Sequence, residues 1–198
     1  MSAVADRIMK RVRGKGRGWV FTPKSFIDFG TRGSIDITLS RLANAGDIRR
    51  LYDYPRQHDK LGAPSPDPAY VAKALSTQSG DRLAPSGAAA ANRLGLSTQV
   101  PARASYATTG RSRVRQAGGR SLTLKHSRAP VPDNAPDSVN AVVQALAHVG
   151  KDNIDSDKIR HFAARLDDRD MRRLAQARAE MPGWMGDVVL KIGAARNG

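Results

Sequence analysis

Apolar residues recur at helical spacing at the start of the chain. Val4, Ile8 and Val12 are four residues apart, which places them on one helix face and predicts a helix over about residues 2–13. The run Trp19-Val20-Phe21 is too short for a helix and partly β-branched, so it predicts a small strand. The chain is therefore expected to begin with a helix followed by a strand.

A short helix is predicted after this strand. Thr22 suits its N-cap, and Pro23 suits its first position because a missing N–H costs nothing there. Phe26 and Ile27 are expected to point inward. Gly30 is expected to end the helix, since glycine tolerates the left-handed conformation of a C-cap.

A second helix is predicted over residues 32–44, between an N-cap at Thr31 and a stop at Gly46. Ile35, Leu39 and Leu42 share its buried face. Its other faces carry Arg32, Asp36, Thr38, Arg41 and Asn44. Reading the DNA major groove requires two helices joined by a tight turn, the second with an exposed polar face. Arginine can pair with guanine and asparagine with adenine.

Residues 47–55 predict a strand whose alternation is uneven. One side would carry Ile48, Arg50, Tyr52 and Tyr54, and the other Arg49, Leu51 and Asp53. With the two helices before it, this stretch predicts a winged helix-turn-helix in which Arg49 and Arg50 contact phosphates. The alternative is an ordinary small helical core with a solvated basic face.

The composition changes after residue 55. Residues 56–68 hold three prolines and predict a linker. Beyond it the pattern predicts helices over 69–75 and 86–94, strands over 102–108, 111–115 and 120–126, and helices over 139–149, 154–166, 168–180 and from Pro182 onward. The expected fold class is α+β. A DNA-binding domain over 1–62 would precede a domain over 63–198, which has a mixed α/β part with β-hairpins (69–128) and a C-terminal helical bundle (137–193).

Charge supports a polyanionic partner. The chain has 33 Lys and Arg against 18 Asp and Glu, a net charge of +15, and the segment from Arg7 to Arg17 is especially basic. The candidate DNA-binding residues are Arg11, Arg13, Lys15, Arg17, Thr22, Lys24, Thr31, Arg32, Ser34, Thr38, Arg41, Arg49 and Arg50. Arg111, Arg113 and Arg115 alternate along a later strand. They suit either a second anionic contact or a solvated edge strand protected by charge.

Composition and spacing argue against other classes of protein. The chain has no cysteine, so it has no disulfide, thiol nucleophile or Cys-ligated zinc. Its four histidines lack metal-like spacing, and Gly14–Gly18 lacks the GK[ST] of a phosphate-binding loop. We therefore expect no catalysis, no metal and no other cofactor. The absence of an apolar run of membrane-spanning length and of a signal core predicts a cytoplasmic protein with no membrane contact.

Three segments together resemble a known family. They are TPKSFIDFGTRGSIDITLSRLANAGDIRRLYDYPR (22–56), SPDP (65–68) and RLAPSGAAAANRLGLSTQVPA (82–102). They are similar to the AbiEi-like antitoxins of type IV toxin–antitoxin systems. The resemblance implies an N-terminal winged helix that binds inverted repeats in the promoter of its own operon and represses it, with a dimer on the DNA as one expectation. It also implies that the C-terminal part counters a nucleotidyltransferase-like toxin.

The resemblance assigns roles to particular residues. Arg32, Thr38, Ser40 and Arg41 would lie on the recognition helix, Arg49 and Arg50 on the wing, and Ser86, Asn92, Gln99 and Pro101 in the antitoxin domain. Such proteins usually have a few more residues, with an Arg-Gly pair, between the equivalents of Arg50 and Leu51. This wing is shorter, so we expect more DNA contact from the recognition helix and the basic N-terminal segment. The alternative is a stand-alone winged-helix regulator whose C-terminal part serves dimerisation or sensing.

Overall fold

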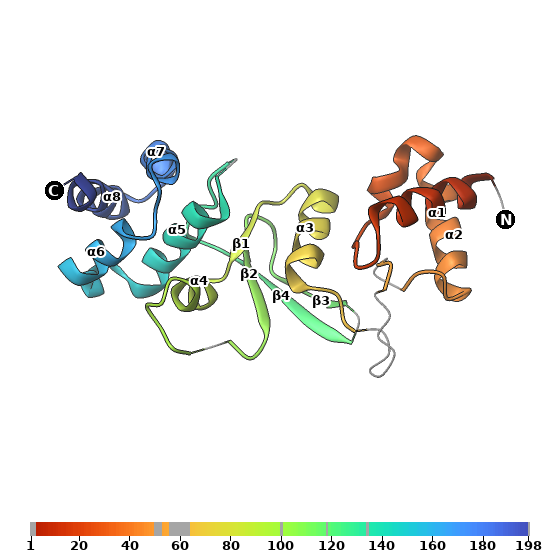
Figure 1. The fold of residues 1–198 in the computed structure, drawn as a ribbon, viewed down its shortest axis with the longest axis horizontal. Coiled ribbons are helices and arrows are strands. Elements are labelled where there is room, and N and C mark those ends of the chain that lie inside the picture. The colour runs from red at the N-terminus through yellow and green to blue at the C-terminus, as the bar shows by residue number, and fades with distance from the viewer. Residues whose placement is uncertain are drawn as a thin grey trace. The chain divides into compact units, whose positions relative to one another are not determined.

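A computed structural model of the chain describes residues 3–49, 53–55, 64–99, 101–117, 119–133 and 135–197. The fold is mixed α+β, as predicted. The chain divides into two compact units (Figure 1): Met1–Asp81 with Val114–Leu122, and Arg82–Arg113 with Thr123–Gly198. Residues 56–63 of the predicted linker lie outside the described residues.

The helices of the first unit begin close to where the sequence predicts them. They are α1 (Ala3–Lys15), the 3-10 helix η1 (Pro23–Phe29), α2 (Arg32–Asn44) and α3 (Pro68–Ser79). The α3 helix continues to Ser79, past the predicted end at residue 75. Asp67 caps α3 by accepting a hydrogen bond from the backbone N–H of Ala69 at 2.8 Å. The α2 helix ends in a Schellman motif: Gly46 has φ +83° and Asp47 N–H donates to the Leu42 carbonyl at 3.0 Å.

One core holds α1, η1 and α2 together. It comprises Ala5, Ile8, Met9, Val12, Phe21, Phe26, Ile35, Leu39, Leu42 and Ile48. Phe26 lies at its centre, with its ring edge-on to Phe21 at 5.3 Å and to Trp19 at 5.8 Å between ring centroids. The inward direction predicted for Ile27 is wrong, because the tighter 3-10 helix turns this side chain into solvent.

The stretch predicted as a single strand over 47–55 folds back on itself. Arg49 and Asp53 exchange backbone hydrogen bonds at 2.9 and 3.3 Å, and Asp53 also bridges to Val20. Tyr54 N–H donates to the Trp19 carbonyl at 3.0 Å, so the predicted strand at 19–21 is reduced to this small bridge. The reversal explains why one alternation could not fit the whole stretch.

A four-stranded sheet of order β1-β2-β4-β3 follows in the chain. Its strands are β1 (Leu83–Pro85), β2 (Ala104–Thr108), β3 (Arg113–Ala117) and β4 (Arg120–His126). Strand β1 was not predicted. It pairs antiparallel with β2 in the register Ala84↔Ala107, although three residues ending in proline give little strand signal.

The remaining helices belong to the second unit. They are α4 (Gly87–Arg93), α5 (Asp137–Val149), η2 (Lys151–Asn153), α6 (Ser156–Ala163), α7 (Asp168–Gln176), η3 (Ala177–Glu180) and α8 (Gly183–Asn197). Figure 1 shows α5 beside α4, and α6 beside α8. Their shared core includes Val142, Leu146, Phe162, Leu174 and Ile192. Within the described part of the chain, no helix combines the length and apolarity that crossing a membrane requires.

Candidate nucleic-acid interface

The exposed face of α2 is the centre of the candidate interface. Gly30 and Thr31 alone separate α2 from η1, and the Thr31 hydroxyl accepts a hydrogen bond from Ser34 N–H at 3.3 Å to cap the helix. Ile35, Leu39 and Leu42 anchor the opposite face in the core. The cap and this buried stripe together fix which side chains α2 presents to solvent.

The solvent side of α2 carries Gly33, Ile37, Arg41 and Asn44, all exposed. Arg41 makes no side-chain hydrogen bond or ion pair within the described part of the chain. Arg32, by contrast, forms an ion pair with Asp36 at 2.9 Å across one helical turn. Arg41 is therefore the more available arginine of this helix.

Sequence reasoning missed Ile37. Its side chain is 56% exposed, although isoleucine commonly lies in cores. Helical phase could have identified it, because Ile37 lies about 200° around the helix from the buried Ile35 at roughly 100° per residue. An exposed apolar side chain among polar ones can contact a thymine methyl group.

Gly33 was also missed. A Cβ added at this position would meet nothing within 4 Å, so packing does not require glycine. Glycine is nevertheless unfavourable inside a helix. A missing side chain in the first turn of an exposed helix allows a ligand to approach the backbone closely.

Two of the candidate threonines are buried. Thr22 is 6% exposed, and the Thr38 hydroxyl is buried and donates to the Ser34 carbonyl at 2.8 Å. Neither side chain can reach a ligand without local unfolding, so both drop out of the candidate interface. For Thr38 the physical reason is helical phase, which places it beside Leu42 and Ile35 and not on the polar face.

Arg49 is engaged in the fold. Its Nη2 and Nε lie 2.6 and 3.1 Å from the Asp53 carboxylate, and Nη2 also donates to the Pro64 carbonyl at 2.8 Å. Asp53 is 2% exposed, so this arginine neutralises a buried charge. Arg50, its predicted neighbour in the interface, lies outside the described residues.

Arg11 is likewise a structural residue. Its guanidinium makes a bidentate pair with Asp28 at 2.7 and 2.9 Å, donates to the Ser25 carbonyl at 2.7 Å and lies 4.0 Å from the Phe29 ring centroid. The hydrogen bond from Arg11 holds the pKa of Asp28 below its ordinary value. The group fastens α1 to η1.

The basic residues after Arg11 divide into engaged and available ones. Arg17 donates to the Pro55 carbonyl at 3.0 Å and lies 4.9 Å from the Tyr54 ring centroid. Arg13 and Lys15, at the end of α1, and Lys24, in η1, are exposed and have no side-chain partner within the described ranges. Thr31 and Ser34, in the first turn of α2, are exposed as well.

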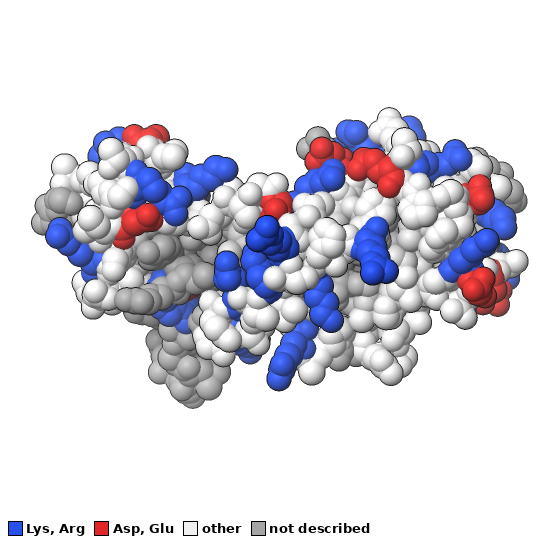
Figure 2. Space-filling view, turned by 180° about the vertical axis from the view of Figure 1, so that it is seen from behind, with Lys and Arg blue, Asp and Glu red and all other residues white. Residues whose placement is uncertain are grey.

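Figure 2 shows how the charged side chains of the described residues lie on the drawn face of each unit. Lys and Arg side chains are scattered there among uncharged ones, and acidic side chains interrupt them at several places. The net charge of +15 is therefore a weaker guide to the interface than the individual contacts of each cation.

The PSG…N segment of the resemblance has a structural explanation. The Ser86 hydroxyl caps α4 by accepting from Ala89 N–H at 3.4 Å, and Asn92 Nδ2 donates to the Ser97 carbonyl at 3.0 Å. A Cβ at Gly87 would lie 2.7 Å from the Cβ of His148 and 3.1 Å from the carbonyl oxygen of Gln144. Glycine thus permits the close approach of α4 to α5.

The remaining residues assigned to the antitoxin domain lie just beyond α4. Gln99 is exposed and its backbone N–H donates to the Ser97 hydroxyl at 3.1 Å, while Pro101 is partly exposed. These contacts are local ones that shape the turn after α4.

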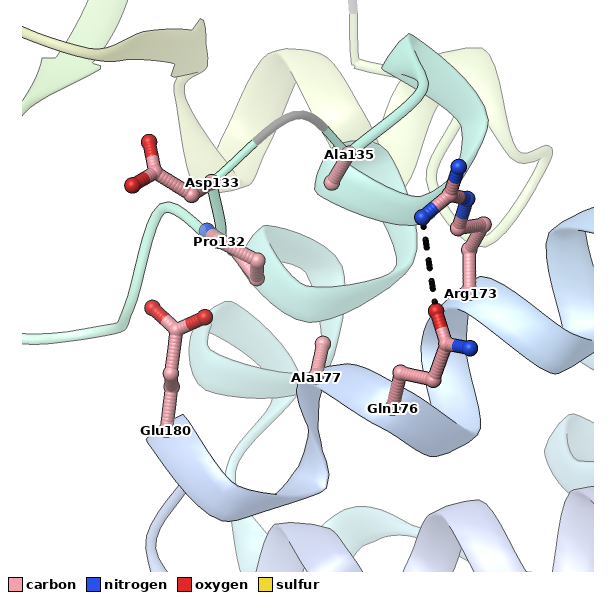
Figure 3. A pocket seen from close by; sticks show the side chains of 7 residues that line it. All are labelled: Pro132, Asp133, Ala135, Arg173, Gln176, Ala177 and Glu180. Atoms are coloured by element: carbon pink, nitrogen blue, oxygen red, sulfur yellow. Dashed lines mark hydrogen bonds between the residues drawn. The ribbon is translucent and has the colours of Figure 1, made fainter.

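A small pocket lies in the second unit (Figure 3). Its volume is ≈ 90 Å³, and it is lined by Pro132, Asp133, Ala135, Arg173, Gln176, Ala177 and Glu180. Arg173 donates to Gln176 at 3.4 Å, and Arg82 lies 3.3 Å from Asp133 and 3.6 Å from Glu180. Ligand pockets are usually about 300 Å³ or larger, so this one is too small for a typical substrate.

Among the described residues, no group of three or more His, Asp or Glu side chains is placed to hold a metal ion. No curated protein and no solved structure matches the chain. The model of DUF6088, a family of unknown function, matches residues 7–174, and because this span covers most of the chain, the chain belongs to that family.

Proposed function

We propose that residues 18–55 form a winged helix-turn-helix that binds double-stranded DNA. The order of elements supports this proposal: two helices separated by two residues follow Val20, and Asp53 then forms antiparallel bridges with both Arg49 and Val20. In this arrangement η1 and α2 are the helix pair, and the reversal between Arg49 and Asp53 is the wing.

The observation that carries the proposal is the exposed face of α2. The exposed Arg41 and Asn44 are of the residue types that bind guanine and adenine, respectively, each through two hydrogen bonds to the edge of the base. Ile37 supplies an apolar contact, and Gly33 allows close approach at the start of the helix. The exposed face of α2 thus combines polar side chains that can read base edges with an apolar contact and a point of close approach.

The remaining DNA contacts are assigned to exposed cations that have no side-chain partner among the described residues. Arg13, Lys15 and Lys24 would contact phosphates, which fix orientation without reading sequence. Arg49 of the wing is not available for such a contact because it pairs with Asp53. Among the described residues, α2 and the end of α1 therefore carry the proposed contacts.

Binding to duplex DNA from the region upstream of the chain's own gene tests the proposal, with a random duplex as reference. Arg41→Ala is expected to lose about 1–3 kcal/mol on the specific site, roughly 5- to 150-fold in Kd, and much less on the random duplex. Arg169→Ala, an exposed arginine of α7, is the matched control. Equal losses on both duplexes would assign Arg41 to phosphate, and no loss would remove α2 from the interface.

We propose further that the chain is an antitoxin of a type IV system that represses its own operon. The support is the resemblance of residues 22–56 and 82–102 to AbiEi-like antitoxins. The partner would be a nucleotidyltransferase-like toxin encoded beside it. Co-expression with that neighbouring gene is the test: growth arrest relieved by the full chain supports the assignment, and arrest that persists refutes it.

A stand-alone winged-helix regulator is the second candidate, and one observation favours it. Ser86, Gly87 and Asn92 cap and pack α4, so this segment does not require a toxin to explain its composition. In that case the second unit serves dimerisation or sensing. Absence of a nucleotidyltransferase gene next to this one would favour the regulator.

A further inference from the structure

The charges of the chain are distributed unevenly in a way that the N-terminal interface does not explain. Between Asp81 and Asp133 the sequence holds eight arginines and one lysine but no acidic residue, although the whole chain has 18 acidic residues in 198. Five of these nine cations lie between Arg111 and Lys125, around strands β3 and β4. We call residues 111–117 and 119–126 the basic hairpin.

Strand β3 of the basic hairpin is exposed on both of its faces. Side chains of a strand alternate between faces, so a strand packed on one side shows alternating burial. Strand β4 does so at Leu122 and Leu124. In β3 the consecutive residues Val114, Arg115 and Gln116 are all exposed, Val114 to 54%. This stretch of β3 therefore adds nothing to a hydrophobic core.

Strand β3 is also an edge of the sheet. Arg111 and Arg120 have no side-chain partner within the described ranges, and Arg115 donates only to the carbonyl of its neighbour Val114 at 3.2 Å. Charge on an edge strand protects it from pairing with another chain. The basic hairpin carries five cations and no acidic residue, which also suits a polyanionic ligand.

Serine, threonine and glutamine side chains lie among the cations at Ser112, Gln116, Ser121 and Thr123. With arginine and lysine, these are the side chains that contact phosphate oxygens of nucleic acids. A guanidinium also matches the geometry of a phosphate with two parallel hydrogen bonds.

We infer that the basic hairpin is a second DNA contact, which binds the phosphate backbone of a duplex without reading its sequence. Duplex DNA is favoured because interfaces with DNA are strongly basic, and the hairpin carries four arginines and one lysine without an acidic residue. The inference rests on the proposed function only for its choice of duplex DNA as the polyanion.

The test uses the full chain and a 30-base-pair duplex of random sequence, so no operator need be known. The salt dependence of the affinity reports the number of phosphates neutralised, with a slope of roughly −0.9 per contact. The variant Arg111→Gln/Arg115→Gln/Arg120→Gln removes three exposed cations. Its slope is expected to be shallower than that of the wild type by about 2 to 3.

A matched control removes the same charge elsewhere. The variant Arg169→Gln/Arg172→Gln/Lys191→Gln changes three exposed cations of α7 and α8 that have no side-chain partner within the described part of the chain. It is expected to change the slope by less than about 1. Circular dichroism of both variants establishes that they are folded, which the exposure of all six positions favours.

The outcomes separate this inference from the proposed function. An unchanged slope for the hairpin variant overturns the inference and leaves an acidic protein as the remaining partner. Equal changes in both variants overturn it too, because net charge alone would then account for them. If the hairpin variant loses slope while Arg41→Ala binds every duplex as the wild type does, the hairpin contact stands and the proposed role of α2 fails.

Discussion

Substitution of Arg49 is expected to lower the stability of the first unit more than substitution of any exposed cation does. Arg49→Ala removes two hydrogen bonds to Asp53, at 2.6 and 3.1 Å, and one to the Pro64 carbonyl at 2.8 Å. The Asp53 carboxylate, 2% exposed, then remains in the core of the hairpin without its counter-charge.

The magnitude follows from this burial. Removing one partner of a buried ion pair costs about 3–5 kcal/mol, because the charge that remains is uncompensated. The Arg49 side chain is 26% exposed, so water can partly replace it, and we take the lower end, about 3 kcal/mol. A domain of this size has about 5–15 kcal/mol of stability in total. Its melting temperature should fall by about 12–24 °C, at roughly 4–8 °C per kcal/mol.

The two tryptophans of the chain make the measurement specific. Trp19 lies against Phe21 in the first unit, and Trp184 packs against the core of the second. In a Trp184→Phe background the fluorescence therefore follows only the unfolding of the first unit, in urea or with temperature. Arg13→Ala is the control, since Arg13 is exposed and unpaired among the described residues, and should change stability by less than about 0.5 kcal/mol.

A second variant distinguishes the buried charge from lost packing. Asp53→Asn in the Arg49→Ala background removes the uncompensated charge and should restore part of the lost stability. If Arg49→Ala unfolds within about 0.5 kcal/mol of the wild type, the assignment of Arg49 to the fold is refuted. If the double variant is no more stable than the single one, lost packing and not the uncompensated charge explains the loss.

Three further predictions concern pH and two glycines. Arg11 lowers the pKa of Asp28, so this pair stabilises the first unit above the unfolded carboxyl pKa of about 3.9 and the contribution is lost as pH falls through the lower folded value. The free energy of unfolding of Asp28→Asn should therefore be lower than that of the wild type at pH 6 and approach it near pH 2, as measured by urea unfolding followed through Trp19 fluorescence. A difference between the two proteins that stays the same at both pH values would contradict this. Gly87→Ala forces a Cβ to within 2.7 Å of the His148 Cβ and should cost about 1–3 kcal/mol, measured through Trp184 in a Trp19→Phe background; a neutral result would mean that α4 and α5 separate freely. Gly33→Ala meets no atom and should stabilise the first unit by about 0.5–1 kcal/mol yet weaken DNA binding; equal or stronger binding would exclude close backbone approach there.

Much of the fold could be predicted because local signals coincide. The bounds of α2 follow from a cap at Thr31, a buried stripe and the positive φ required at Gly46. The reversal between Arg49 and Asp53 was not predicted, and the residues that follow it pair with Trp19 and Val20, which lie more than 30 residues earlier in the chain. Strand β1 was not predicted either, since its partner β2 lies about 20 residues later in the chain.

For the candidate interface, the sequence predicted which types of residue take part but not which individual residues are available to a ligand. The sequence identifies the cations, but it does not show which of them form ion pairs and hydrogen bonds within the fold. Arg11 and Arg49 pair with acids 17 and 4 residues away, whereas Arg13 and Arg41 remain free among the described residues. Helical phase alone would have removed Thr38 and added Ile37, since both positions follow from the buried stripe of α2.

Two arginines that donate hydrogen bonds to backbone carbonyls also bear on how an insertion between Pro55 and Pro64 would affect the stability of the first unit. Arg17 binds the carbonyl of Pro55 and Arg49 that of Pro64, and both carbonyls belong to the first unit. Pro55 and Pro64 are therefore both held to the first unit by hydrogen bonds. Closing a longer segment between them costs only about 0.6 kcal/mol per doubling of its length. A peptide tag inserted between residues 56 and 63 should leave the fold of that unit nearly as stable, which offers a place to attach a fluorophore or an affinity handle.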